Sequence, residues 1–371
     1  MTNETTITPV PFNDLGRGTQ LLRPQIDEAI ARVLSSGWYV LGPEHNAFET
    51  ELSTYLGVEH TVAVGNGTDA LQLALTSVGV VAGDTVLTAA NAGGYTSTAA
   101  RSLGATPVFA DVDASTLLLT VATVESALDL LPGKPKAIVV THLFGAVADI
   151  QAIVELAHAR GISVVEDCAQ SLGAMAGDVR AGSVADVSTT SFYPTKNLGA
   201  LGDGGAVFTS DDTVASTLRQ LRQYGWESKY RTTLSGGRNS RLDELQAAVL
   251  RTKLPHLDAW SDRRREIHVA YEQAIGSGAR MVNRSNPGFV GHLAVIEADD
   301  RPRAQAILAE HGVRSDIHYP ISDHEQPIAT GGSLVPLPVT EAATERILSV
   351  PLFPELTADE VSRVAAALSE I

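Results

Sequence analysis

The sequence predicts an α/β fold in which a mainly parallel sheet is flanked by helices and followed by a smaller C-terminal α+β domain. Short apolar runs alternate with helical patterns between about residues 61 and 209, an arrangement typical of βαβ units. Some of these runs are continuously apolar, as in Ala137–Val140, which indicates a parallel sheet buried on both faces. From about residue 213 the pattern becomes mostly helical and then mixed, which indicates a second domain.

The individual elements follow from the spacing of the apolar residues. In the helix expected over Thr68–Val78, Leu71 and Leu75 recur at helical spacing. The other expected helices are Tyr95–Leu103, Val121–Leu131 and Ile150–Arg160. The expected strands are Thr61–Val64, Thr85–Ala89, Thr106–Ala110, Ala137–Thr141, Ser163–Glu166, Val187–Phe192 and Ala206–Thr209.

The C-terminal part has a looser pattern. Residues 213–275 read as mostly helical, His292–Glu297 as a strand and Arg303–Glu310 as a helix. Thr357 and Glu360 form a capping box that starts a final helix. We place the domain boundary near Pro255, which gives a large α/β domain over 12–255 and a small α+β domain over 256–371.

The composition excludes several classes of partner. The chain has 371 residues and a formal net charge of −16, from 27 Lys and Arg against 43 Asp and Glu. Nucleic acid and anionic membranes need a basic footprint, so neither is expected as a partner. The N-terminal stretch has no signal-peptide pattern and no apolar run approaches the length of a membrane span, so we expect a cytoplasmic protein.

Disulfide and metal chemistry are not expected either. Cys168 is the single cysteine, which excludes an intrachain disulfide and a cysteine-based zinc site. His318 and His324 have a loose metal-like spacing, but no third ligand is indicated. The sequence therefore predicts no metal site.

A glycine-rich turn joins the first predicted strand to the helix at Thr68. Glycines let backbone N–H groups approach an anion, and a helix N-terminus adds the positive end of its dipole. Gly65–Ala70 also matches the dinucleotide fingerprint G-x-G-x-x-A, but Asp84 precedes the next strand, whereas that fingerprint needs an acid at the strand's end. Three interpretations stay open at this point: a phosphate cradle, a packing turn and an NAD site.

Two further residues have side chains suited to one cofactor. Asp167 ends a predicted strand at the carboxyl edge of the sheet, where open α/β folds bind ligands. Lys196 follows a strand and a proline turn and enters a glycine-rich run, a desolvating setting that lowers the pKa of a lysine. Pyridoxal phosphate requires a Schiff-base lysine and an acid against its pyridine nitrogen. Lys196 and Asp167 therefore predict this cofactor, with its phosphate at the Gly67–Thr68 turn.

A set of longer motifs runs from about Phe12 to Val364. The motifs are Gly65–Leu71, Gly104–Asp113, His142–Gly145, Glu166–Ala174, Ser191–Val207, Leu221–Gly225, Asn239–Leu250, His318–Pro320 and Ser349–Thr357. In these stretches the chain resembles the sugar aminotransferases of the DegT/DnrJ/EryC1/StrS family, which are fold-type I pyridoxal-phosphate enzymes. The resemblance implies a homodimer with shared active sites.

The resemblance also implies roles for single residues. Lys196 matches the Schiff-base lysine that moves the catalytic proton, and Asp167 matches the carboxylate that keeps the pyridine nitrogen protonated. The other implied contacts are Gln170 near the ring hydroxyl, Gly67, Thr68 and Ser191 at the phosphate, Asn239 at the phosphate from the second subunit, and His318 and Tyr319 on the substrate side. A purely structural role for His318 is equally open.

One position departs from the family pattern. The aromatic residue that usually stacks on the cofactor ring falls, counting back from Gly104, on Gly93. The Gly93–Gly94 pair permits a local change of backbone conformation. We therefore expect Tyr95 to supply the stacking ring.

The activity that the resemblance implies is transfer of an amino group from L-glutamate to a nucleotide-linked keto-deoxysugar, with a dTDP-linked 3-keto-6-deoxyhexose as the expected acceptor. Amination at C4 is the alternative within the family. An NAD-dependent oxidoreductase and a non-catalytic ligand-binding relative are alternatives of other classes. Arg222, Lys229 and Arg241 are candidate contacts for the sugar diphosphate, each equally open to being a solvated charge.

Overall fold

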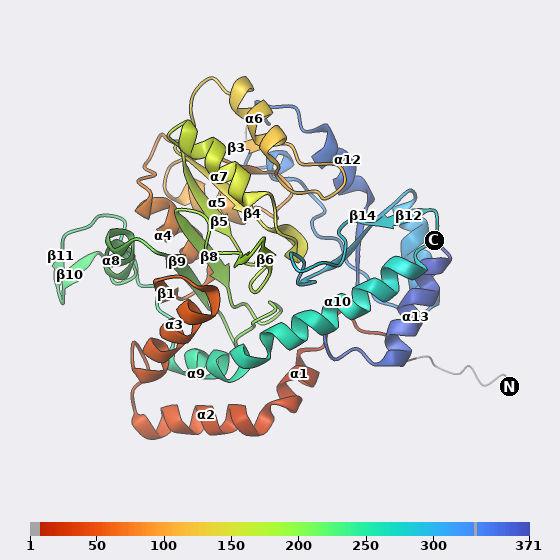
Figure 1. Cartoon of the computed structure of the whole chain (residues 1–371), viewed down its shortest axis with the longest axis horizontal. Helices are drawn as coiled ribbons and strands as arrows, with labels where there is room; N and C mark the ends of the chain where they lie inside the picture. The colour runs from red at the N-terminus through yellow and green to blue at the C-terminus, as the bar shows by residue number, and fades with distance from the viewer. Residues whose placement is uncertain (1–7, 330–331) are drawn as a thin grey trace.

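A seven-stranded sheet forms the centre of the chain in a computed structural model, which describes residues 8–329 and 332–371 (Figure 1). Its strands are β1 His60–Val64, β2 Thr85–Ala89, β3 Thr106–Ala110, β4 Ala137–Thr141, β5 Ser163–Asp167, β8 Val187–Ser191 and β9 Gly205–Thr209. Their order is β1-β9-β8-β5-β4-β2-β3. β9 runs antiparallel to β1 and β8, and the other neighbours pair in parallel. The predicted, mainly parallel sheet is confirmed.

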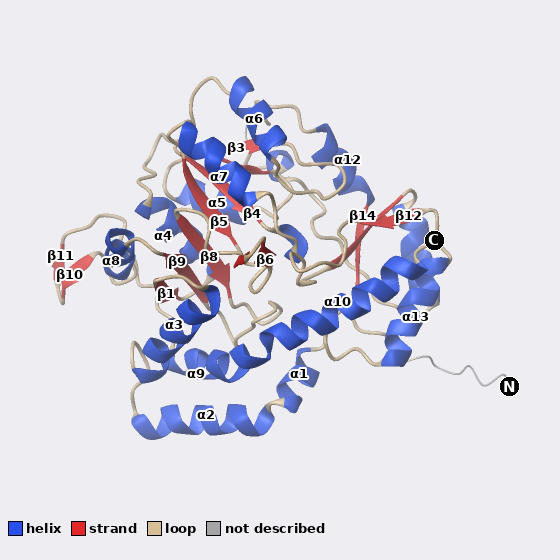
Figure 2. Cartoon of the chain, viewed as in Figure 1, coloured by secondary structure: helices blue, strands red, loops and turns tan. Residues whose placement is uncertain are grey.

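Helices cover both faces of this sheet (Figure 2). They are α3 Pro43–Leu56, α4 Gly67–Ser77, α5 Tyr95–Ser102, α6 Val121–Leu130, α7 Ile150–Ala159, α8 Asp212–Leu221 and α9 Glu244–Lys253. On β4, Ile138 and Val140 pack with α6 and α7, whereas Ala137 and Val139 pack with α4, α5 and α8. Because helices cover both faces of β4, neither face is exposed to solvent, which explains its continuous apolar run.

The C-terminal part forms a three-stranded antiparallel sheet with helices around it. Its strands are β12 Ala279–Met281, β13 Ala294–Ala298 and β14 Ile347–Val350, and its helices are α10 Leu257–Ala274, α11 Arg301–Glu310, α12 Pro338–Arg346 and α13 Ala358–Ser369. The predicted capping box is confirmed, because Thr357 and Glu360 exchange side-chain and backbone hydrogen bonds at the start of α13. The division into 12–255 and 256–371 stays a prediction.

Several elements are additional to those expected from the sequence. Three helices, α1 Leu15–Leu21, α2 Arg23–Ser36 and α3, lie before the first expected strand. A short hairpin, β10 Trp226–Ser228 and β11 Arg231–Thr232, interrupts the stretch that was expected to be mostly helical, and it projects at the edge of the molecule beside α8 (Figure 1). Another small hairpin, β6 Met175–Ala176 and β7 Val179–Arg180, follows β5.

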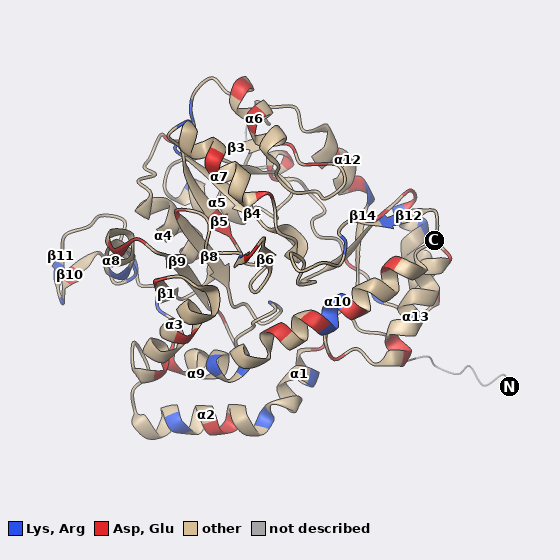
Figure 3. Cartoon of the chain, viewed as in Figure 1, with Lys and Arg blue, Asp and Glu red and all other residues tan. Residues whose placement is uncertain are grey.

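Charged residues lie mainly on the outer helices, such as α2 and α10, and the strands of the central sheet carry few of them (Figure 3). This distribution agrees with a sheet that is buried between helices. Within residues 8–329 and 332–371, every helix is too short or too polar to cross a membrane.

Candidate active site

A cavity of about 620 Å³ opens where β5 and β8 end and where α4 and α5 begin. Its walls include most of the predicted site residues: Gly67, Thr68, Tyr95, Asp167, Ser191, Lys196, His318 and Tyr319. The carboxyl ends of parallel strands meet at one edge of a sheet. This topology brings residues from distant parts of the sequence into one cavity.

Lys196 lies in a loop that is held by backbone hydrogen bonds. Its N–H donates to the carbonyl oxygen of Tyr193 at 2.8 Å, and the Ala200 N–H donates to that of Phe192 at 2.8 Å. Burial lowers the pKa of the Lys196 ammonium to about 8, against the opposing charge of Asp167. A fraction of this amine is therefore uncharged near neutral pH, as a nucleophile requires.

Asp167 is the last residue of β5, and its carboxyl group is buried. Oδ1 accepts a hydrogen bond from the Ala169 N–H at 3.0 Å, and Oδ2 accepts one from Thr141 Oγ1 at 3.3 Å. Burial raises the pKa of this carboxyl, although the Ala169 N–H and the charge of Lys196 favour its ionised form. An acid in this environment can share a proton with a basic nitrogen of a bound ligand.

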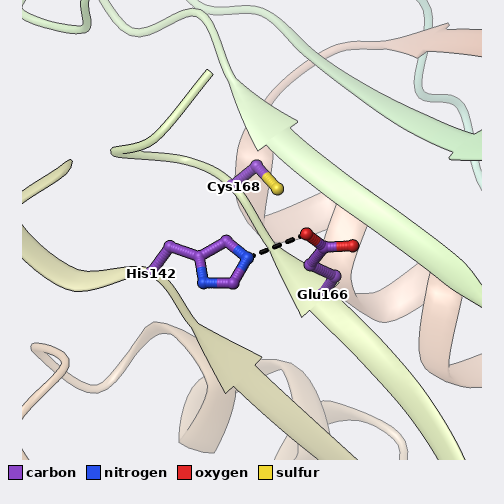
Figure 4. A group of neighbouring side chains, drawn as sticks. All are labelled: His142, Glu166 and Cys168. Atoms are coloured by element: carbon purple, nitrogen blue, oxygen red, sulfur yellow. Dashed lines mark hydrogen bonds and ion pairs between the residues drawn. The ribbon is translucent and has the colours of Figure 1, made fainter. Parts of the chain in front are cut away.

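A second buried cluster lies next to the end of β5 and consists of His142, Glu166 and Cys168 (Figure 4). His142 Nδ1 accepts a hydrogen bond from the Ala148 N–H at 3.1 Å, so Nε2 carries the proton and donates it to Glu166 Oε1 at 2.8 Å. Glu166 also accepts a hydrogen bond from the Gly182 N–H at 2.6 Å. Both imidazole nitrogens are used within the protein, so the cluster ties β4 to β5 and is not arranged as a set of metal ligands.

The predicted phosphate contacts meet where α4 begins. Asn66 caps this helix, and its Oδ1 accepts a hydrogen bond from the Asp69 N–H at 2.8 Å. A Cβ at Gly67 would lie 2.7 Å from Ser191 Cβ, so only glycine lets the turn approach the end of β8 this closely. The N–H groups of Gly67 and Thr68 belong to the first turn of the helix, where backbone donors and the helix dipole favour an anion.

Gln170 contacts the cavity wall through Tyr319. Its Oε1 accepts a hydrogen bond from the Phe144 N–H at 2.6 Å, which fixes the orientation of the amide. Its Nε2 then donates to Tyr319 Oη at 3.1 Å. The two residues, 149 positions apart, are therefore coupled at the site.

Tyr95 of α5, and His318 and Tyr319 from the segment between α11 and α12, also line the wall. Tyr95 is 49% exposed, and the edge of its ring faces Tyr319 at a centroid distance of 6.2 Å. The His318 ring stacks on Phe12 at 5.6 Å, and its Nδ1 lies 3.0 Å from Ser349 Oγ. Burial lowers the pKa of His318, which favours its neutral form.

Asn239 lies outside the walls of its own cavity, and its side chain is exposed. The next residue, Ser240, accepts a hydrogen bond at its Oγ from the Gly65 N–H at 2.9 Å, so Asn239 directly precedes a residue that is anchored to the phosphate turn. Its contact with a second subunit stays a prediction.

The sequence-based expectation for Arg222 is wrong. Its guanidinium is buried and pairs with Glu49, and Nη1 also donates to the Ala63 carbonyl oxygen at 2.9 Å. It is therefore neither a sugar-diphosphate contact nor a solvated charge. Lys229 is exposed and Arg241 is partly exposed, and their roles stay predictions.

Sequence reasoning missed His292, which lines the cavity. Asn197 Nδ2 donates to the Val290 carbonyl oxygen at 2.9 Å, so Asn197 Oδ1 is the acceptor for His292 Nδ1 at 3.1 Å. Burial and the charge of Lys196 hold the pKa of His292 well below its ordinary value. The site thus contains a neutral imidazole whose Nε2 carries a lone pair. Only tertiary contacts reveal it, because no sequence motif joins these residues.

The topology contradicts the NAD interpretation of Gly65–Ala70. β1 lies at the edge of the sheet and pairs antiparallel with β9, whereas a dinucleotide fingerprint follows a strand inside a parallel sheet. Asp84 Oδ2 accepts a hydrogen bond from the Val81 N–H at 2.9 Å and so closes a local turn. Gly65–Ala70 and Asp84 are therefore not arranged to bind a dinucleotide.

Comparison with known proteins identifies related proteins over nearly the whole chain. The model of the DegT/DnrJ/EryC1/StrS aminotransferase family matches residues 20–369. The chain is 40% identical over 368 residues to dTDP-3-amino-3,4,6-trideoxy-alpha-D-glucose transaminase of Streptomyces venezuelae, covering 97% of this chain and 96% of the relative. It is 40% identical over 364 residues to the erythromycin biosynthesis sensory transduction protein EryC1 of Saccharopolyspora erythraea, covering 97% and 98%. It is 37% identical over 364 residues to UDP-N-acetyl-3-dehydro-alpha-D-glucosamine 3-aminotransferase of Acidithiobacillus ferrooxidans, covering 97% of each.

Two solved structures have the same fold as this chain, and each contains a bound ligand. DesV of Streptomyces venezuelae, in complex with a ketimine intermediate, superposes with a TM-score of 0.93 at 38% identity over 98% of each chain. NtdA of Bacillus subtilis, with bound cofactor PMP, superposes with a TM-score of 0.91 at 29% identity over 99% of this chain and 86% of that one.

Proposed function

The chain belongs to the DegT/DnrJ/EryC1/StrS aminotransferase family, and from that membership we propose that it transfers an amino group from L-glutamate to a keto-deoxysugar carried by a nucleotide. It is an aminotransferase with the fold of this family, and its cofactor is pyridoxal phosphate. The sugars named for its relatives carry dTDP or UDP. We favour a dTDP-linked 3-keto-6-deoxyhexose, because a relative at 40% identity is named for a dTDP-3-amino sugar.

The residues of the cavity fit pyridoxal phosphate at three points. Lys196 offers a buried amine, Asp167 a buried acid, and the Gly67–Thr68 turn beside Ser191 an anion site. When bound, the cofactor supplies an electron sink for negative charge at the substrate carbon. The convergence of amine, acid and anion site in one cavity is the observation that carries the proposal.

Lys196 has two tasks in this proposal. Its uncharged Nζ, which a pKa of about 8 makes available, is the nucleophile that attaches the cofactor. When it is not bonded to the cofactor, this amine would take the proton from the donor Cα as a general base. The same Nζ returns a proton on the acceptor side, so one residue serves both substrates.

Asp167 would hold a proton on the ring nitrogen of a bound cofactor. Its carboxyl is costly to ionise when buried alone, but a protonated nitrogen beside it offsets that cost. Thr141 Oγ1 and the Ala169 N–H orient the two carboxyl oxygens. Asp167 therefore fixes both the place and the charge of the ring.

A homodimer with shared active sites is part of the proposal. Trp38, Tyr39 and Val40, between α2 and α3, are 57%, 49% and 40% exposed. An exposed apolar stretch of this kind supports burial against another protein surface. In such a dimer the exposed Asn239 would reach the phosphate in the second subunit. The cytoplasmic location stays a prediction.

The test is a panel of acceptors with L-glutamate and pyridoxal phosphate. dTDP-linked 3-keto- and 4-keto-6-deoxyhexoses and a UDP-linked 3-keto sugar are compared, and both the amino-sugar nucleotide and 2-oxoglutarate are quantified by mass spectrometry. We expect the dTDP-linked 3-ketone to turn over fastest. Faster turnover of the 4-ketone supports the alternative regiochemistry, and no amine transfer to any acceptor contradicts the proposal.

A further inference from the structure

The loop between β2 and α5 carries no side chain at the position where an aromatic ring is expected over the cofactor. Gly93 has a φ of +78°, a conformation that favours glycine. A Cβ built on it would lie 2.9 to 3.0 Å from ring atoms of Tyr319. The Tyr319 ring therefore fills the space into which a side chain at position 93 would extend.

Hydrogen bonds fix the Tyr319 ring from the cofactor side of the cavity. Gln170 Nε2 donates to Tyr319 Oη at 3.1 Å, and Gln170 is itself held by the Phe144 N–H. Gln170 follows Asp167 and Ala169 in the sequence. Asp167 and Ala169 line the same cavity as Tyr319. The Tyr319 phenol is thus anchored to the segment that carries Asp167, the acid proposed to face the pyridine nitrogen.

The chain around Tyr319 is also docked on the loop that contains Gly93. The Asp323 N–H donates to the Ala90 carbonyl oxygen at 2.7 Å, and Ser97 Oγ donates to Asp323 Oδ2 at 2.6 Å. These bonds join the segment between α11 and α12 to the end of β2 and to α5. They hold the Tyr319 ring against Gly93 and limit its movement away from the cavity.

Tyr95 occupies a more exposed position. It is 49% exposed, and its ring meets Tyr319 edge to face, with centroids 6.2 Å apart and planes at 78°. Burial, by contrast, raises the pKa of the Tyr319 phenol, as expected for the more enclosed ring. Tyr319 therefore lies nearer than Tyr95 to the place left by Gly93.

We propose that Tyr319 supplies the aromatic face that stacks on the pyridine ring, in place of a residue at position 93, and that Tyr95 packs behind it as a second layer. This inference rests on the proposed function, because it assigns a residue to the cofactor of that site. It makes retention of the cofactor depend on the docking of the segment between α11 and α12, which also carries His318. One segment thus contributes to both the cofactor and the substrate sides of the cavity.

The test compares Tyr319→Leu with the matched variant Tyr95→Leu and with Tyr319→Phe. Each apo-protein is titrated with pyridoxal phosphate, and affinity and dissociation rate are followed by visible absorbance and induced circular dichroism. Stacking between aromatic rings predicts about a 3- to 10-fold loss of affinity for Tyr319→Leu, a smaller loss for Tyr95→Leu, and near-complete rescue by Tyr319→Phe.

A larger loss for Tyr95→Leu than for Tyr319→Leu overturns the inference and returns the stacking role to Tyr95. Thermal unfolding of each apo-protein shows whether it is folded. If Tyr319→Leu does not fold, Tyr319→Met, whose flexible side chain adapts to irregular space without an aromatic face, carries the same comparison. If the wild-type protein gives no visible adduct with pyridoxal phosphate, the proposed function fails. If the wild type binds the cofactor and all variants bind it with equal affinity, only the stacking role of Tyr319 is overturned.

Discussion

The charge state of one buried amine controls the chemistry at the residue scale. Because burial lowers the pKa of Lys196 to about 8, attachment of pyridoxal phosphate to the apo-protein should accelerate with rising pH and level off above about pH 8. Asp167 raises the pKa of Lys196, so Asp167→Asn should shift the midpoint to lower pH. Stopped-flow absorbance over a pH series measures both midpoints. A wild-type midpoint near the ordinary lysine pKa of about 10.4 contradicts a buried amine.

Single residues differed in how far the sequence could predict them. Lys196 and Asp167 were predictable because their chemistry depends on local features, a glycine-rich loop and a strand end. His292 was not, because its tautomer depends on a contact with Asn197, 95 positions away. The apposition of Tyr319 and Gly93 is likewise a property of the folded chain.

At the scale of elements, a buried ion pair joins α3 to the end of α8. Arg222 pairs with Glu49 and donates to the Ala63 carbonyl oxygen of β1. Removing one partner of a buried pair leaves the other charge uncompensated, so Arg222→Ala should lower the free energy of unfolding by about 3–5 kcal/mol. Arg219→Ala, at an exposed position of α8, is the control and should change it by about 0.5 kcal/mol or less. Equal effects in denaturant titrations would exclude this role of the pair.

The same pair predicts part of the acid sensitivity of the fold. Burial alone raises the pKa of Glu49, but the hydrogen bond from His45 and the charge of Arg222 bring it down to about 2 from an ordinary 4.5. The stabilisation is therefore complete above about pH 4.5 and is lost as the pH falls toward about 2. Glu49→Gln should be less stable than the wild type at neutral pH, and the difference should shrink through this window. A pH-independent difference in thermal unfolding contradicts the low pKa.

Elements were predictable where burial dictates the pattern. The strands of the central sheet matched their apolar runs because both faces are covered, as in β4. The hairpin of β10 and β11 was missed because its short strands are mostly exposed and no buried face imposes a period. The buried state of Arg222 was missed for a related reason, since Glu49 and His45 come from a helix that the sequence pattern did not indicate.

At the scale of the whole molecule, the shared active site can be tested by mixing subunits. Lys196→Ala removes the amine of one subunit's own site, and Asn239→Glu places a negative charge at the phosphate of the other subunit's site. Each homodimer should be inactive, whereas mixed dimers keep one intact site, so an equal mixture should recover about one quarter of wild-type activity. No recovery after subunit exchange, shown by native mass spectrometry, contradicts shared sites.

The most direct measurement is borohydride reduction of the protein with pyridoxal phosphate, followed by peptide mass mapping. We predict that the cofactor mass is found on the peptide that contains Lys196 and is absent from Lys196→Ala, which should remain folded and lose transamination. Labelling of another lysine, or continued turnover in Lys196→Ala, would show that this amine does not hold the cofactor.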